Sequence, residues 1–154
     1  MNKILLTGLI VMPLITSHAF AAKNVGEQNS VADIVINKAI DSGKIIPCDS
    51  PDSNCKGMGM QYSAFYSPDK KTAIVWTFGF PTEGTAHIGK FSEFKDENGW
   101  KFVKNYEKPL SDYPAPKKED IQFHGNTVSV KYKFKKRSDP NRGSTGNGVS
   151  NLKL

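Results

Sequence analysis

The sequence lacks the common signatures of catalysis. It contains no Gly-x-Ser-x-Gly nucleophile elbow, no His-Glu-x-x-His motif, no phosphate-binding glycine-rich loop and no Cys-x-x-Cys redox pair. Groups that could act as nucleophiles or metal ligands are also scarce, with three histidines and two cysteines among 154 residues. These absences favour a binding protein over an enzyme, and we expect no cofactor.

The chain also lacks an apolar run long enough to cross a membrane. Its longest run, residues 4–15, is shorter than the roughly 18 to 20 residues that a spanning helix needs. The run follows Lys3 and is followed by Ala19 and Ala21, small residues at the two positions that a signal peptidase reads. We therefore expect residues 1–21 to be a signal peptide cleaved near Ala21, with no transmembrane anchor. This places the product in the bacterial periplasm or the secreted space.

The two cysteines, Cys48 and Cys55, lie close together across a turn-forming segment. In an oxidising compartment such an isolated pair forms a disulfide, which would stabilise the fold by roughly 2.5 kcal/mol in the chain-entropy model. A zinc site would need two further ligands at matching spacing. Met58 and Met60 are too few to make a copper site. We expect a single disulfide and no metal.

Length and patterning predict a single α+β domain over residues 22–137. Ser30 is the expected N-cap of an N-terminal helix that stops at Gly43. From Gln61 onward the pattern alternates as in strands, which predicts an antiparallel sheet of about five or six strands, packed against the helix. Residues 138–154 have little to bury, so we expect a disordered basic tail.

The most apolar predicted strand covers residues 73–80 and has two unequal faces. Ile74, Trp76 and Phe78 lie on a large face, opposite a smooth face of small side chains. We expect the helix to pack on the large face. The small face would then be open to a second layer or a ligand, and an uncovered sheet face lined by Trp76 or Trp100 would indicate a lipid site.

Asn98 and Gly99 predict the turn of a hairpin with two possible registers. A two-residue loop places opposite charges directly across from each other, as in Glu93 with Lys104, and is the register that we favour. A three-residue loop would instead pair two aromatic residues and two lysines, namely Phe94 with Phe102 and Lys95 with Lys101.

A second hairpin is predicted over residues 121–135, and its second strand carries a row of outward basic residues. The row comprises Lys131, Lys133 and Lys135, and it continues into Lys136 and Arg137. Tyr132 and Phe134 point to the opposite side, so the row lacks the interleaved aromatics of a nucleic-acid surface. Two interpretations remain open: lysines that protect an edge strand from aggregation, or a surface for an anionic partner or ligand.

Two histidines, His87 and His124, lie outside the signal segment. A histidine pair with a nearby lysine is the minimum for acid and base catalysis on a phosphodiester, so a small hydrolase is one hypothesis. Each residue also has a simpler role, His124 at a hairpin turn and His87 in a strand after the loop at residues 81–85.

The leading hypothesis is a non-enzymatic binding or inhibitory protein that contacts another envelope or secreted protein. The net charge of +6 is moderate and compatible with many anionic partners. The candidate contact elements are the loops at residues 48–55 and 81–85 and the proline-rich connection at residues 107–118. The alternatives are binding of a lipid or another anionic small ligand, and hydrolysis that uses His87 and His124.

Overall fold

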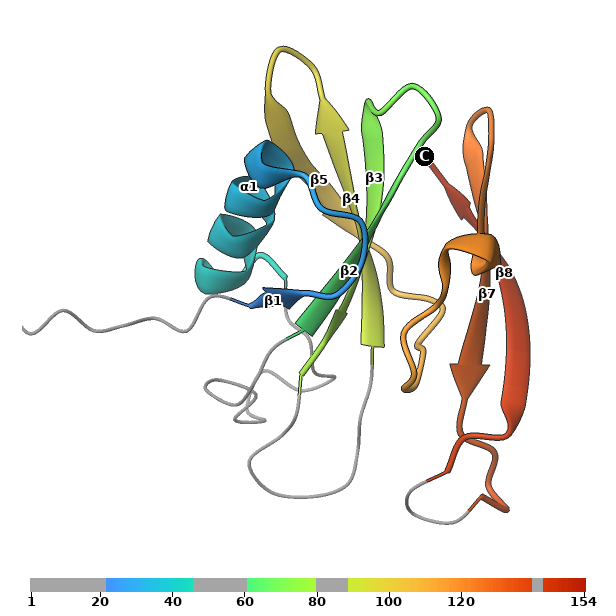
Figure 1. Ribbon diagram of the computed structural model, residues 1–154. Helices are drawn as coiled ribbons and strands as arrows, with labels where there is room; N and C mark the ends of the chain where they lie inside the picture. Colours follow the sequence, from blue (N-terminus) through green and yellow to red (C-terminus); the bar gives the residue numbers. More distant parts are fainter. Residues whose placement is uncertain (1–21, 46–60, 80–88, 140–142) are drawn as a thin grey trace, which may run out of the picture.

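The computed structural model describes residues 22–45, 61–79, 89–139 and 143–154, arranged in three successive layers (Figure 1). The outer layers are a helix, α1 (Ser30–Asp41), and a three-stranded sheet, sheet B. Between them lies a five-stranded sheet, sheet A. The strands of sheet A are, in spatial order, β1 (Lys23–Asn24), β2 (Gln61–Tyr66), β3 (Thr72–Phe78), β4 (Gly89–Asp96) and β5 (Trp100–Asn105). Those of sheet B are β6 (Ile121–His124), β7 (Thr127–Phe134) and β8 (Gly146–Lys153), and a 3₁₀ turn, η1 (Lys118–Asp120), precedes β6.

The predicted α+β character is confirmed, but the single antiparallel sheet is wrong. Sheet A is mixed, because β1 runs parallel to β2, and the last three strands form a separate sheet. The predicted signal peptide at residues 1–21 lies outside the described residues. So do the predicted disulfide of Cys48 and Cys55, His87 and the loop at residues 81–85.

The N-cap of helix α1 lies one residue earlier than expected, and the helix begins at Ser30. Asn29, not Ser30, is the N-cap: its extended backbone lets its side chain accept a hydrogen bond from Ala32 N at 3.2 Å. Asp33 completes a reciprocal pair by accepting from Asn29 N at 3.3 Å. The helix ends as predicted, with Gly43 at φ +72° just beyond the last turn.

The helix packs on the small face of β3, which corrects the expected orientation of this strand. Ala73 and Val75 share a buried core with helix residues such as Ile36. Tyr62 ties the layers together, since its hydroxyl donates to Asp33 Oδ1 at 2.9 Å. Small side chains on the sheet leave room for the helix, while the bulky ones need the deeper layer that sheet B provides.

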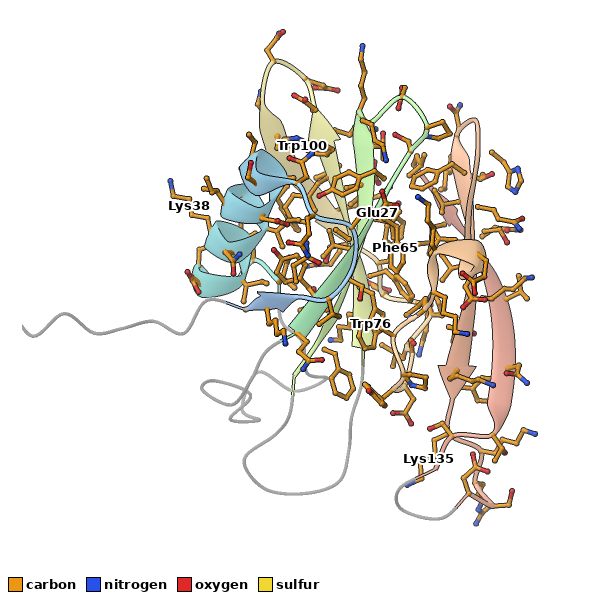
Figure 2. All side chains as sticks on the ribbon, viewed as in Figure 1. Glu27, Lys38, Phe65, Trp76, Trp100 and Lys135 are labelled. Atoms are coloured by element: carbon orange, nitrogen blue, oxygen red, sulfur yellow. The ribbon has the colours of Figure 1, made fainter. Side chains whose placement is uncertain are left out.

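The large face of β3 lies against sheet B. Trp76 and Phe78 are buried with residues of β7 and β8 such as Val128 and Leu152 (Figure 2). Trp100 is buried in the other core, under the helix. In the described part of the chain, therefore, sheet B covers the sheet face that a lipid site would have left open.

The proline-rich connection joins the two sheets at one corner. Ser111 pairs with Gly89, at the start of β4. Its neighbour Asp112 pairs with Lys133 of β7, with its N–H donating to the Lys133 carbonyl at 2.7 Å. The connection thus contributes one residue pair to each sheet and no continuous ladder, as its prolines predict.

The β4–β5 hairpin contains both registers that the sequence allows. Near the turn the loop has three residues, with Asn98 and Gly99 at positive φ, so the favoured two-residue loop is wrong there. A bulge between Glu93 and Phe94 then shifts the register, and Glu93 faces Lys104 as the favoured register predicted. The ring of Phe94 packs against the ring of Phe102, with their centroids 5.6 Å apart. The repulsion between the opposed Lys95 and Lys101 is reduced by Glu93, whose carboxylate lies 3.2 Å from Lys95 Nζ.

Strand β8 corrects the prediction of a disordered tail. It pairs with β7 along its whole length, from Lys153 opposite Thr127 to Gly146 opposite Phe134. Two of its four inward positions, Gly146 and Gly148, are glycine because the rings of the partner strand fill the space: a Cβ on Gly148 would lie 2.5 Å from Tyr132 Cζ. The aromatic rings that pack on these glycines belong to β7. The low hydropathy of residues 138–154 therefore did not indicate that this segment forms a strand.

Candidate functional site

The outer face of sheet B carries the predicted basic row. Val128 and Val130 of β7 are fully buried toward sheet A, so Lys131 and Lys133 point outward. We define the basic face as the outward side chains Lys131, Lys133, Asn147, Val149, Asn151 and Lys153, together with the exposed Lys135, Lys136 and Arg137 that follow them. None of β6, β7 and β8 contains an aspartate or glutamate.

Both interpretations of the lysine row stay predictions. Strand β7 lies between β6 and β8, but β6 pairs only with residues 127–130, so Lys131 and Lys133 lie beyond the end of β6. On that side of β7, Asp112 pairs with Lys133. The edge strands of sheet B are β6 and β8, and β8 has no charged residue from Gly146 to Leu152. The position of the two lysines is compatible with protection of an edge and with contact to an anionic partner.

The basic face leans toward the β8 edge. Lys133 Nζ donates to Asn147 Oδ1 at 2.5 Å, which places the ammonium over β8. Val149 stands opposite Lys131 on the neighbouring strand, and 66% of its surface is exposed. An exposed apolar side chain among lysines and asparagines gives this face both an electrostatic and an apolar contact point.

The outer edge of β8 has main-chain groups without partners among the described residues. His124 and Thr127 close a two-residue turn, and such a closing pair is hydrogen-bonded, which fixes the alternation across sheet B. In β8 the even-numbered residues bond to β7, so the N–H and C=O groups of Asn147, Val149 and Asn151 point away from the sheet. The Lys153 carbonyl confirms this direction by accepting from Lys104 Nζ at 2.7 Å and from the Tyr106 hydroxyl at 3.1 Å.

A hollow of about 300 Å³ opens beside this edge on the inner side of sheet B. Its lining residues are largely apolar and come from β7, β8 and the proline-rich connection: Lys108, Pro109, Leu110, Tyr132, Phe134 and Ser150. Ser150 belongs to β8 and points inward, so the hollow lies directly next to the strand that has the free edge.

A second groove, of about 430 Å³, separates β7 from the proline-rich connection. Lys117, Lys131 and Lys133 line it with positive charge, and Glu119 and Asp120 of η1 lie among them. Lys131, Lys133, Asn147 and Val149 of the basic face line this groove, so the two carboxylates of η1 adjoin the basic face on its β6 side.

A buried carboxylate anchors the upper end of β8 to sheet A. Glu93 is fully buried and accepts a hydrogen bond from the Tyr106 hydroxyl at 2.7 Å. Lys104 Nζ lies 3.3 Å from the same carboxylate, and both partners also reach the Lys153 carbonyl. Burial and the adjacent carboxylate raise the pKa of Tyr106 well above its ordinary value. The hairpin register predicted the Glu93–Lys104 pair, whereas no local sequence pattern indicated the contact with Tyr106.

The histidine hypothesis finds no supporting geometry. His124 is exposed at the end of β6, where its carbonyl accepts from the Thr127 hydroxyl at 3.1 Å. His87 lies outside the described residues, so the pair is untested. In the described ranges no three His, Cys, Asp or Glu residues are grouped to hold a metal ion. No described helix is long and apolar enough to span a bilayer.

Comparison with protein-family models, with curated proteins and with solved structures finds no match to this chain. The features of the described residues that indicate a function are the basic face and the free edge of sheet B.

Proposed function

We propose that this chain is an exported, non-enzymatic binding or inhibitory protein of the periplasm or secreted space that acts by contact with another protein. The observation that carries the proposal is the basic face: lysines on a rigid sheet, with no carboxylate on any of its three strands. A surface with an excess of positive charge favours a partner of negative charge, and it speeds the encounter between the two. The partner is therefore a protein with an acidic surface.

The character of the face supports a protein over a nucleic acid. Tyr132 and Phe134 lie on the inner side of sheet B, beside Gly148 and Gly146, and so are not available for base stacking on the basic face. Val149 offers an exposed apolar contact instead, which suits a protein interface. Nothing in the described residues favours the lipid or hydrolase alternatives.

Export and the disulfide belong to the same proposal. Residues 1–21 direct the chain out of the cytoplasm, and Cys48 and Cys55 pair in the oxidising compartment that it reaches. A ring closed by this disulfide between α1 and β2 stabilises the domain by restricting the unfolded chain.

A capture experiment with charge-reversed variants tests the proposal. The purified protein is immobilised and exposed to the envelope and secreted fractions of the producing cell, and bound proteins are quantified by mass spectrometry. The double variant K131E/K133E reverses the basic face. Its control, K38E/K44E, makes the same change in charge at two exposed lysines, one in α1 and one just after it. Lys38 lies on the opposite side of the molecule from sheet B (Figure 2).

We expect an acidic protein that is captured in stoichiometric amount by the native protein and by K38E/K44E, but not by K131E/K133E. Equal capture by both variants would show that the basic face is not the binding surface. Absence of any captured protein after crosslinking would remove the proposal itself.

A further inference from the structure

We infer that the free edge of β8 accepts an extended acidic segment of the partner protein, which adds to sheet B as a fourth strand. This inference rests on the proposed function and names the part of the partner that is recognised. Strand addition at an edge uses main-chain hydrogen bonds for affinity and alternate side chains for specificity.

The hydrogen-bonding groups needed for such a strand are in place. The outward N–H and C=O groups of Asn147, Val149 and Asn151 repeat at every second residue, as an added strand requires. The edge carries no proline, and it has no charged residue between Gly146 and Leu152. These are the devices by which proteins usually block an edge, and β8 has neither.

The hollow selects the inward side chains of the added strand. Residues of the segment that face the inner side of sheet B would lie beside Gly148 and Ser150, next to the hollow of about 300 Å³. Pro109, Leu110 and Phe134 supply the apolar part of its lining, beside Lys108 and Ser150. Aliphatic side chains at these alternate positions would fill it and gain apolar burial.

The surrounding charge selects the outward side chains. Lys133 already lies over β8 through its contact with Asn147, and Lys131 stands on the same face. Lys104 lies at the upper end of the edge, at the Lys153 carbonyl. Carboxylates at the outward positions of the segment lie within reach of these ammonium groups, so the fitting sequence alternates aliphatic and acidic residues.

A second copy of this chain fits the edge less well. If β8 paired with itself in antiparallel fashion around Val149, Gly148 would lie opposite Ser150 of the other copy. Neither side chain could fill the apolar hollow. On the outward side Val149 would meet Val149 and Asn147 would meet Asn151 of the other copy, so the edge would gain no negative charge near Lys131 and Lys133. Chemistry therefore points to an acidic segment of a different protein.

Fluorescence anisotropy with model peptides tests the inference. The probe is a capped, labelled nine-residue peptide that alternates valine and glutamate, and the charge control alternates valine and lysine. Two N-methylated forms of the first peptide separate strand pairing from simple charge attraction. In an added antiparallel strand, which is the arrangement that we infer, the glutamate N–H groups face β8 and the valine N–H groups face solvent, so only methylation at glutamate removes the pairing.

We expect the valine–glutamate peptide to bind with micromolar affinity that weakens with salt, and its valine-methylated form to bind within about threefold. The glutamate-methylated form and the valine–lysine peptide should each bind at least tenfold more weakly. Equal binding by the two methylated forms, equal binding by the lysine peptide, or no binding at millimolar peptide would each overturn the inference.

A protein variant gives the reciprocal test. V149P removes one outward N–H and leaves the hydrogen bonds between β7 and β8 intact, whereas V149T keeps that N–H. We expect V149P to lose at least tenfold in affinity for the valine–glutamate peptide and V149T to stay within threefold, with thermal melts verifying that both fold. If V149P does not fold, binding of the two N-methylated peptides to the native protein still tests whether the peptide pairs with β8.

Two outcomes separate this inference from the proposed function. Capture of an envelope protein that depends on Lys131 and Lys133 but survives V149P would leave the proposed function standing and overturn strand addition. Light scattering that shows a dimer of the native protein and a monomer of V149P would assign the edge to a second copy and overturn the acidic segment.

Discussion

Glu93 is the one fully buried charged residue among the described residues, and three side chains hold it. The Tyr106 hydroxyl donates to it at 2.7 Å, and the ammonium groups of Lys95 and Lys104 lie at 3.2 and 3.3 Å. Its burial is tolerated because two positive charges and a hydroxyl compensate for the lost water. At the scale of single residues this carboxylate links β4, β5 and β8.

E93Q tests the importance of that charge. The amide has nearly the same shape but no negative charge, so the two lysines lose their counter-ion. We expect the free energy of unfolding to fall by about 1 to 3 kcal/mol in urea titrations. E97Q, which makes the same change in the exposed turn, should cost less than about 0.5 kcal/mol. Equal stability of E93Q and E97Q would contradict the structural role of Glu93.

Two buried tyrosines predict a loss of stability in alkali. Burial raises the pKa of Tyr62 above its ordinary value, and the hydrogen bond to Asp33 adds to it. Burial, with a smaller contribution from Asp33 and Glu27, raises the pKa of Tyr66, whose hydroxyl is buried without a partner. Both groups stay protonated in the folded state while the unfolded chain ionises near pH 10. Their contribution is therefore complete below about pH 10 and is lost above it.

Urea titrations between pH 9 and pH 11 measure this loss. We expect the free energy of unfolding to fall by roughly 1.4 kcal/mol per pH unit for each of these two tyrosines once pH exceeds about 10, and Tyr106, whose pKa is also raised, adds to the slope in the same way. Y66F has no hydroxyl to ionise, so its slope should be smaller. An unchanged slope in Y66F would show that Tyr66 ionises in the folded state as it does in the unfolded chain.

At the scale of elements, the turns carried most of the predictive information. Asn98-Gly99 and Gly125-Asn126 located both hairpins, because few residues other than Asn and Gly adopt positive φ at low cost. Local charge and aromatic pairs indicated two registers for the first hairpin, and the bulge at Glu93 let the chain satisfy both. The sequence could not show this, because a bulge is decided by packing on both sides of the strand.

Two elements escaped prediction for one physical reason: their apolar contacts come from another strand. The sequence of β8 is polar and rich in glycine, which is typical of a tail. Its glycines pack under Tyr132 and Phe134 of β7, a contact that the sequence of β8 does not indicate. The faces of β3 were assigned in reverse because the size of a side chain does not reveal which layer covers it. For the candidate site, the lysine row was predictable from alternation alone, whereas the free edge beside it required the topology.

G148A tests the packing that makes β8 a strand. The added Cβ would lie 2.5 Å from Tyr132 Cζ, so the ring or the strand must shift. We expect a loss of about 1 to 3 kcal/mol in the free energy of unfolding, typical of overpacking. N151A, which truncates an exposed outward side chain of the same strand, should change stability by less than about 0.5 kcal/mol. Similar small effects of both variants would mean that β8 is not held as described.

At the scale of the whole molecule, the three layers give the protein two unlike sides. The helix covers one face of sheet A, while sheet B covers the other and presents its lysines outward (Figure 1). Both faces of sheet A are thereby used for the core, and sheet B keeps its outer face and the β8 edge for contact with a partner. The proposed function depends on this division.

The export proposal predicts the covalent form of the mature protein. Expressed with its full sequence and recovered from the periplasm or medium, the protein should begin at Ala22 and lack the thiol hydrogens of Cys48 and Cys55. Intact-mass spectrometry before and after reduction checks both points in one sample. A product that retains residues 1–21, or one with two free thiols, would count against the corresponding part of the proposal.

The most direct test of the account is residue-resolved amide hydrogen exchange of the protein, alone and with its captured partner. In the free protein the outward N–H groups of Asn147, Val149 and Asn151 should exchange fast, while those of Gly148 and Ser150, bonded to β7, exchange slowly. The partner should slow the three outward amides by at least tenfold and leave amides of the helix region, such as that of Lys44, which donates to the Ala39 carbonyl, unchanged. Slow exchange of the three amides in the free protein, or protection by the partner only around the helix, would contradict the account.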